Sequence, residues 1–163
     1  MINEIIKEQN ESFYFKYDIE KMPTGISGLI LEILYQFKDD KLHVKIDNRV
    51  KENLLTVVGY KKYNLMCDYL GIILNNALEA CKESKEKLVL IEFSEKEDII
   101  VVKVTNSFKG TINVDKIGDL NYTTKEFGHG LGIYSIISRK KIKTSFIIKN
   151  NYFISQIIIN KAN

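Results

Sequence analysis

The chain has 163 residues, of which 45% are hydrophobic and 28% charged, as in an ordinary soluble globular domain. Lys and Arg total 24 against 21 Asp and Glu, and a net charge of +3 is too small to indicate nucleic-acid binding by itself. No uncharged stretch approaches the ~20 apolar residues of a membrane-spanning helix, and the N-terminus lacks the pattern of a secretory signal peptide.

The first third of the chain predicts a linker, a helix and two strands. Residues 1–20 are polar with scattered aromatics, and the breaker cluster Met22–Gly25 is predicted to begin the next element. Apolar residues at helical spacing then predict a helix over Ile26–Phe37. Alternating apolar and polar residues predict a strand over Lys41–Asp47, and a second short strand is predicted over Leu54–Val58.

The middle of the chain predicts a long helix and then a hairpin. The helix covers Tyr63–Ser84, with Asn64 as a reasonable N-cap. Leu88–Phe93 and Ile99–Val104 flank a polar turn and are typical of paired strands. Residues 105–128 are polar with little periodicity, and so long a loop inside a compact domain is more often functional than filler.

The last third predicts a helix over Gly130–Lys141 and a hairpin of Ser145–Lys149 with Tyr152–Ile159, joined at Asn150–Asn151. The two predicted hairpins make a mostly antiparallel sheet, and the helices between them would cover one face. The predicted fold class is therefore α+β, a two-layer sandwich with a mixed sheet and helices on one face.

Two cysteines lie in the long predicted helix. Cys67 and Cys81 are 14 residues apart, and a helix would separate them by about 20 Å, beyond the reach of a disulfide. We expect both to be small apolar core residues of a reduced, cytosolic protein. No Cys/His cluster has the spacing of a metal site.

The first candidate motif is an asparagine pair in the same helix, within the run Leu74–Ala80. Asn76 lies one turn beyond Ile72 and Ile73, on the face expected to meet the sheet, and a buried amide needs partners. Either the helix floors a pocket that holds an ion or phosphate oxygens, or Asn75 faces solvent and Asn76 bonds a neighbouring backbone group.

The second candidate motif is the run Thr123–Ile133, in which Gly128, Gly130 and Gly132 alternate ahead of a helical pattern. Such glycines let backbone N–H groups point into one concavity, and the helix N-terminus adds partial positive charge that suits phosphate oxygens. The threonine pair adds hydroxyls, and Lys125 adds a mobile cation. A purely structural turn is the alternative.

The order of these motifs resembles the GHKL ATPases, which have the Bergerat fold. A helix bearing N-A-x-E-A is followed by a strand hairpin, a polar loop, T-T-K and G-H-G-L-G-I, from about Gly28 to Ile159. Within that superfamily the sequence is most similar to the peptide-pheromone (Agr-type) quorum-sensing sensor histidine kinases. The resemblance implies an ATP-binding catalytic domain over residues 21–163, and a linker or the tail of a dimerisation helix over residues 1–20.

The resemblance implies ATP and Mg²⁺ as cofactors, with Asn76 as the Mg²⁺ ligand and Leu131 as the packing residue of the glycine box. Residues 106–127 would be a lid over the nucleotide. The nucleotide-binding residues that it implies are Asn76, Asn106, Thr124, Lys125, Gly128, His129, Gly130, Leu131 and Gly132.

The chain departs from the family pattern at two positions. The family usually places Asn or Glu four residues before the Mg²⁺ asparagine, where this chain has Ile72, so the catalytic residue stays unknown. The adenine-binding box usually carries an aspartate, where this chain has Asn106. Because an amide can donate and accept, Asn106 could hold the adenine edge, or it could cap a turn.

The resemblance also implies the reaction and its partners. The only histidines are His43, on a predicted strand, and His129, in the glycine box, so the γ-phosphoryl group would pass to a histidine on a dimerisation helix outside this chain. A response regulator is the implied downstream partner, and the location would be the cytoplasmic portion of a membrane-anchored sensor. We expect no nucleic-acid partner and a monomeric isolated domain.

Two other functions remain open at this point. Ile72 raises the alternative of a GHKL nucleotide-binding or interaction module without turnover. A hydrolase of the gyrase or chaperone kind would need a glutamate where Ile72 stands, and Glu79 follows Asn76 rather than preceding it.

Overall fold

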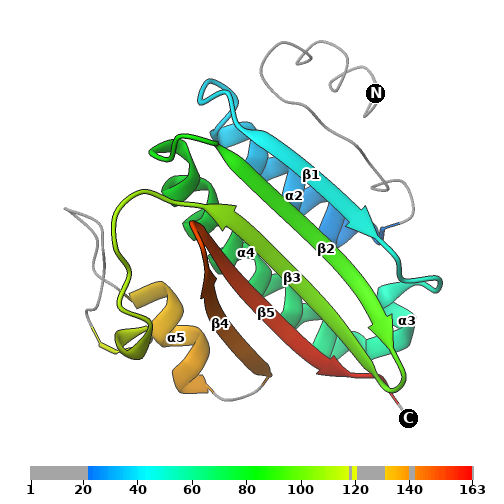
Figure 1. Ribbon diagram of the computed structural model, residues 1–163. Helices are drawn as coiled ribbons and strands as arrows, with labels where there is room; N and C mark the ends of the chain where they lie inside the picture. The colour runs from blue at the N-terminus through cyan, green and yellow to red at the C-terminus, as the bar shows by residue number, and fades with distance from the viewer. Residues whose placement is uncertain (1–21, 118, 121–130, 140–141, 163) are drawn as a thin grey trace.

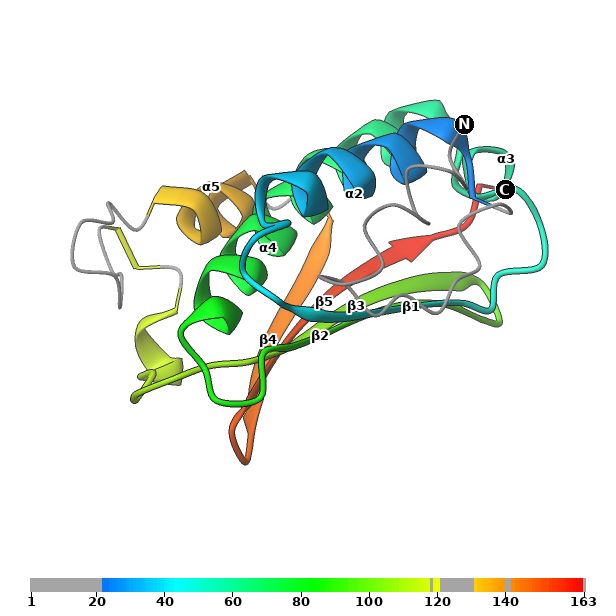
Figure 2. The same cartoon turned by 90° about the horizontal axis from the view of Figure 1, so that it is seen from above.

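The computed structural model describes residues 22–117, 119–120, 131–139 and 142–162, and folds them into two layers. One layer is a five-stranded sheet in the order β1-β2-β3-β5-β4, and the other consists of helices packed on one face of it (Figures 1 and 2). This arrangement confirms the predicted α+β sandwich.

The sheet is antiparallel except at one edge. Strand β1 (His43–Asn48) runs parallel to β2 (Leu88–Lys96), which forms a hairpin with β3 (Ile99–Ser107). The second hairpin, β4 (Lys143–Lys149) and β5 (Tyr152–Asn160), joins the sheet through antiparallel pairing of β5 with β3. Both predicted hairpins are confirmed.

The helical layer contains the two longest helices side by side. Helix α2 (Thr24–Gln36) and helix α4 (Tyr60–Lys82) cross the sheet, and α5 (Leu131–Arg139) lies beside α4 (Figure 2). The short helix α3 (Leu54–Val58) precedes α4, and a 3₁₀ turn, η2 (Val114–Lys116), follows β3. In the described part of the chain, no helix is long and apolar enough to cross a membrane.

The core forms where the inward faces of β2 and β3 meet α2 and α4. Alternate strand residues point at the helices, and each helix presents one apolar stripe to them. The fully or almost fully buried members include Ile26, Ile30, Ile73, Leu74, Leu78, Val89, Ile91, Phe93, Ile100, Val102 and Val104. Burial of this apolar area is the main force that holds α4 in a fixed position on the sheet.

Two local predictions were wrong. Leu54–Val58 is a helix, not a strand, because the Asn53 side chain accepts a hydrogen bond from the Leu55 N–H at 3.0 Å and caps it. A short apolar run alone does not distinguish the two structures. Helix α4 begins at Tyr60 after Gly59, whose φ of 78° turns the chain, so Asn64 lies inside the helix and is not its cap.

The two thiols of α4 should differ in reactivity. Cys81 is completely buried and Cys67 partly buried, and burial raises the pKa of both thiols. Because the thiolate is the reactive form, we expect slow labelling of Cys67 that accelerates as the pH rises, and labelling of Cys81 only after unfolding. Thiol titration of the wild type and of Cys67→Ser, with and without denaturant, tests this. Rapid labelling of folded Cys67→Ser would contradict the packing described here.

Candidate functional site

The candidate residues in the described part of the chain lie on α4, β3 and α5. The C-terminal half of α4, the end of β3 and the loop toward η2 lie at the same end of the sheet (Figure 1), and α5 contacts α4 there. Segments distant in the sequence are therefore brought together at this end by the folding of the sheet.

Asn76 and Gly132 are in contact. A Cβ atom built on Gly132 would lie 3.3 Å from Asn76 Nδ2 and 3.2 Å from Ile72 Cγ2. The first turn of α5 thus lies close to α4 at Gly132, where even a methyl group would be tightly packed. The asparagine of the first motif and the last glycine of the second motif form one structural feature.

The orientation of Asn76 differs from the expected one. The sequence placed it on the face of the helix that meets the sheet, but Ile73, Leu74 and Ala77 occupy that face and are buried. Asn76 is only partly buried and faces the start of α5. Its amide can therefore meet a polar ligand at the border of the core without being buried within it.

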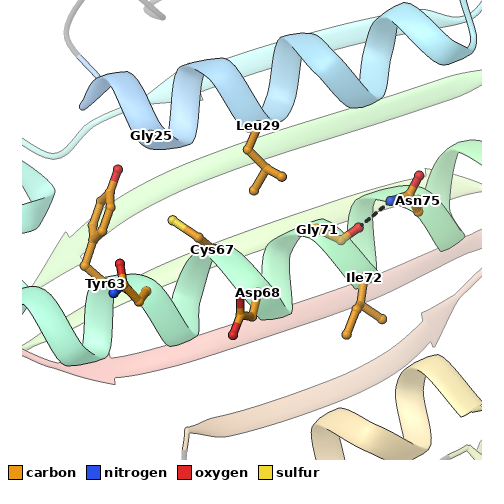
Figure 3. A pocket seen from close by; sticks show the side chains of 9 residues that line it. Gly25, Leu29, Tyr63, Cys67, Asp68, Gly71, Ile72 and Asn75 are labelled. Carbon is orange, nitrogen blue, oxygen red and sulfur yellow. Dashed lines mark hydrogen bonds between the residues drawn. The ribbon is translucent and has the colours of Figure 1, made fainter.

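Asn75 has a different environment from Asn76. Its Nδ2 donates a hydrogen bond to the Gly71 carbonyl of the preceding turn at 3.0 Å (Figure 3). Its side chain lines a groove between α2 and α4 rather than facing α5. The two adjacent asparagines thus serve different surfaces of one helix, as their separation of about 100° around the axis requires.

The groove between α2 and α4 has a volume of about 470 Å³ and is mainly apolar with amide and carboxylate groups at its rim. Tyr63 lies at the end where α2 begins, and its hydroxyl accepts a hydrogen bond from the Ile26 N–H at 3.0 Å. The residues that line it are Gly25, Leu29, Tyr63, Asn64, Cys67, Asp68, Gly71, Ile72 and Asn75 (Figure 3).

Ile72 lies between this groove and the Asn76–Gly132 contact. It lines the groove, packs against the hydrophobic core and approaches Gly132. An aliphatic side chain can neither bind a metal nor accept a proton, so Ile72 contributes only packing at this position.

Asn106 is the penultimate residue of β3 and is 2% exposed. It lies on the inward face with Val102 and Val104, and its Nδ2 donates to the Ser107 carbonyl at 2.9 Å. This local bond uses one N–H of the amide. The amide oxygen and the second N–H are the groups that could hold the edge of a base.

Sequence reasoning overlooked the residues that support Asn106. Ser107, Ser84 and Cys81 are buried and hydrogen-bonded to one another where β3 and α4 end. Serines near the ends of elements are common, so the sequence carried no signal for them beyond the adjacency of Ser107 and Asn106.

Several predicted site residues lie outside the described residues, namely Thr124, Lys125, Gly128, His129 and Gly130. Leu131 is the first residue of α5. The roles assigned to these positions stay predictions.

The described residues contain no group of three or more His, Cys, Asp or Glu side chains that could hold a metal ion. Among the described residues, a hard cation at Asn76 would find one amide oxygen there and would take its other ligands from water and from oxygens of the nucleotide. Mg²⁺ is often bound in this way, with one or two ligands from the protein and the rest from water and substrate phosphates. The donor set at Asn76 fits Mg²⁺ together with a phosphorylated ligand.

Residues 62–160 match the family model described as the GHKL domain, which covers more than half of the chain. The chain belongs to the GHKL domain family. The matched range contains all but the first two residues of α4, together with both hairpins and α5, and thus both candidate motifs. No curated protein sequence matches the chain significantly.

Solved histidine kinase structures share the fold of this GHKL domain. The nucleotide-free catalytic domain of histidine kinase ThkA is 19% identical with a TM-score of 0.67, over 84% of this chain and 90% of that one. Histidine kinase AdeS of Acinetobacter baumannii is 18% identical with a TM-score of 0.59, over 83% and 64%. Full-length ShkA in complex with AMPPNP is 16% identical with a TM-score of 0.58, over 83% and 30%.

Gly132→Ala tests the contact between α4 and α5. Because the new Cβ would lie 3.2 Å from Ile72 Cγ2 and 3.3 Å from Asn76 Nδ2, these side chains or the start of α5 must move by a few tenths of an ångström. Displacement of the Asn76 amide should lower the affinity for ATP about fivefold. Gly28→Ala is the matched control, since nothing lies within 4 Å of a Cβ built there.

Removing the nearer obstacle should reduce the effect. In an Ile72→Ala background the Cβ of Gly132→Ala loses its closest neighbour, so the additional loss of affinity should be smaller than in the wild type. Equal losses in both backgrounds, measured by nucleotide titration, would mean that this contact does not limit binding.

Proposed function

We propose that this GHKL domain binds ATP with Mg²⁺ and transfers the γ-phosphoryl group to a histidine on a dimerisation helix outside residues 21–163. It would thus act as the catalytic domain of a two-component sensor histidine kinase. The observation that carries the proposal is the contact of Asn76 with Gly132, which joins the two motifs at one point.

Each part of this feature has a chemical role in the proposal. Asn76 supplies an amide oxygen to Mg²⁺, and the ion when bound neutralises charge on the β- and γ-phosphates. Backbone N–H groups of the glycine box and of the first turn of α5 hold phosphate oxygens. Gly132, lacking a side chain, leaves this backbone accessible next to Asn76. Thr124, Lys125 and His129 would contact the phosphates from the preceding loop, and residues 106–127 would cover the nucleotide.

Ile72 does not exclude this reaction. Phosphoryl transfer depends mainly on positioning and charge stabilisation, and the phosphoacceptor histidine is itself a nucleophile. The similarity of the fold to histidine kinase catalytic domains favours a kinase over an interaction module without turnover. An apolar residue at this position should slow the transfer without preventing it.

The finer assignment is an Agr-type quorum-sensing kinase, which the motif order and Asn106 in the adenine-binding box support. A response regulator would then receive the phosphoryl group. The domain would be the cytoplasmic portion of a membrane-anchored sensor, with residues 1–20 leading from the dimerisation helix.

Phosphoryl transfer in trans tests the proposal. Incubation with γ-labelled ATP, Mg²⁺ and a separate dimerisation domain should label its histidine. Ile72→Asn should raise the rate, by about tenfold or more, because the amide can orient the acceptor, whereas Ile72→Val, which stays apolar, should leave the rate near that of the wild type. No labelling of cognate or related dimerisation domains by folded protein that binds ATP would contradict the kinase assignment.

A further inference from the structure

A closed ring of hydrogen bonds lies where α4 ends, β2 begins and β3 ends. Ser84 Oγ lies 2.7 Å from Ser107 Oγ and 2.7 Å from the Cys81 carbonyl oxygen, and Cys81 Sγ lies 3.7 Å from Ser107 Oγ. The three residues, called the hydroxyl ring below, are 0 to 5% exposed.

Each hydroxyl has a single hydrogen, which limits the directions of these hydrogen bonds to two sets; the first is as follows. Ser84 donates its single hydroxyl hydrogen to the Cys81 carbonyl and accepts from the Lys87 N–H at 3.0 Å. In this set Ser107 donates to Ser84 across the 2.7 Å contact between the hydroxyls. In the other set Ser84 donates to Ser107, and Ser107 donates to the Leu88 carbonyl at 3.3 Å. Both sets link Ser107 to Ser84. Ser107 Oγ in turn accepts from the Leu88 N–H at 2.9 Å, and the Cys81 S–H completes the ring.

The ring anchors the residue that orients Asn106. In a regular strand Ser107 would point to the opposite face from Asn106, away from the helices. Instead both residues are buried, and the Ser107 hydroxyl bonds Cys81 of α4 and the Leu88 N–H at the start of β2. These bonds and the pairing of Ser107 with Tyr152 of β5 together hold its backbone, and its carbonyl accepts from Asn106 Nδ2 at 2.9 Å. Because the amide is planar, Oδ1 of Asn106 then points away from the Ser107 carbonyl.

An amide needs such an anchor where a carboxylate does not. The two oxygens of a carboxylate are equivalent acceptors, whereas an amide turned by 180° exchanges its acceptor for a donor. An Asn in the place of the usual Asp can recognise one kind of base edge only if its orientation is held.

We propose that Ser84, Ser107 and Cys81 are positioning residues that hold the Asn106 oxygen as a hydrogen-bond acceptor, and so select a purine with an exocyclic 6-amino group over one with a 6-oxo group. This inference rests on the proposed ATP site and adds to it the basis of base selectivity. The three residues act through Asn106 and do not contact the nucleotide.

The test compares the affinities for ATP and for inosine triphosphate, which carries a 6-oxo group, in the presence of Mg²⁺. The wild type should prefer ATP by about tenfold or more, since a site built for a donor leaves its acceptor unpaired against the oxo group. Ser107→Ala should reduce this preference by about fivefold. Ser84→Ala should reduce it less, because Ser107 can still donate to the Leu88 carbonyl at 3.3 Å.

Two controls separate orientation from general damage. Ser107→Thr keeps the hydroxyl and should retain the wild-type preference for ATP over inosine triphosphate. Ser94→Ala removes a hydroxyl elsewhere in the sheet and should also leave that preference unchanged. In an Asn106→Asp background, Ser107→Ala should leave the preference unchanged, because a carboxylate has no donor side to misplace.

Folded Ser84→Ala and Ser107→Ala that retain the full preference would overturn the inference, as would a wild type that binds ATP and inosine triphosphate equally. If Ser107→Ala does not fold, Ser84→Ala decides, compared in the wild-type background, where the preference should fall, and in the Asn106→Asp background, where it should not change. A folded wild type that binds neither nucleotide would contradict the proposed function itself.

Discussion

The close approach of α5 to α4 at Gly132 is the constraint on which the candidate site depends. Core packing fixes α4 on the sheet, and the second motif lies close to the first at Gly132, where even a methyl group would be tightly packed. Asn76 borders the buried face of α4 and meets this glycine, so one amide gains access to a ligand without the cost of full burial. The chemistry proposed for the domain requires this single point of contact between two distant segments.

The same contact explains what Ile72 does. It packs against the core, lines the groove beside α2 and lies against Gly132, so its aliphatic side chain stabilises the junction where the GHKL pattern usually has Asn or Glu. In the proposed reaction, binding and transfer would thereby be separated, because Asn76 and the glycine backbone would hold the phosphates while the acceptor histidine would lack an orienting partner at Ile72. The proposed site would therefore bind the nucleotide well but transfer its γ-phosphoryl group slowly.

Strong periodicity made most of the fold predictable, since the helix before β1, the long α4 and both hairpins follow from helical spacing, alternation and the Asn150–Asn151 turn. Leu54–Val58 failed because an apolar run of five residues fits either structure and a side-chain cap decided it. Asn76 was found by its unexpected polarity, but its orientation depends on α5, which no local pattern specifies. The hydroxyl ring was not predictable, because its members come from α4, the turn after it and β3 and are joined only by folding.

Calorimetric titration with ATP, with and without Mg²⁺, tests the central claim most directly, using the wild type, Asn76→Ala and Asn75→Ala. Asn75 is the matched control because its amide bonds the Gly71 carbonyl and lines the groove beside α2. We predict Mg²⁺-dependent binding by the wild type that Asn75→Ala retains and Asn76→Ala loses, by about 10- to 100-fold in affinity. No binding by folded wild type, or binding that Asn76→Ala leaves unchanged, would contradict the account.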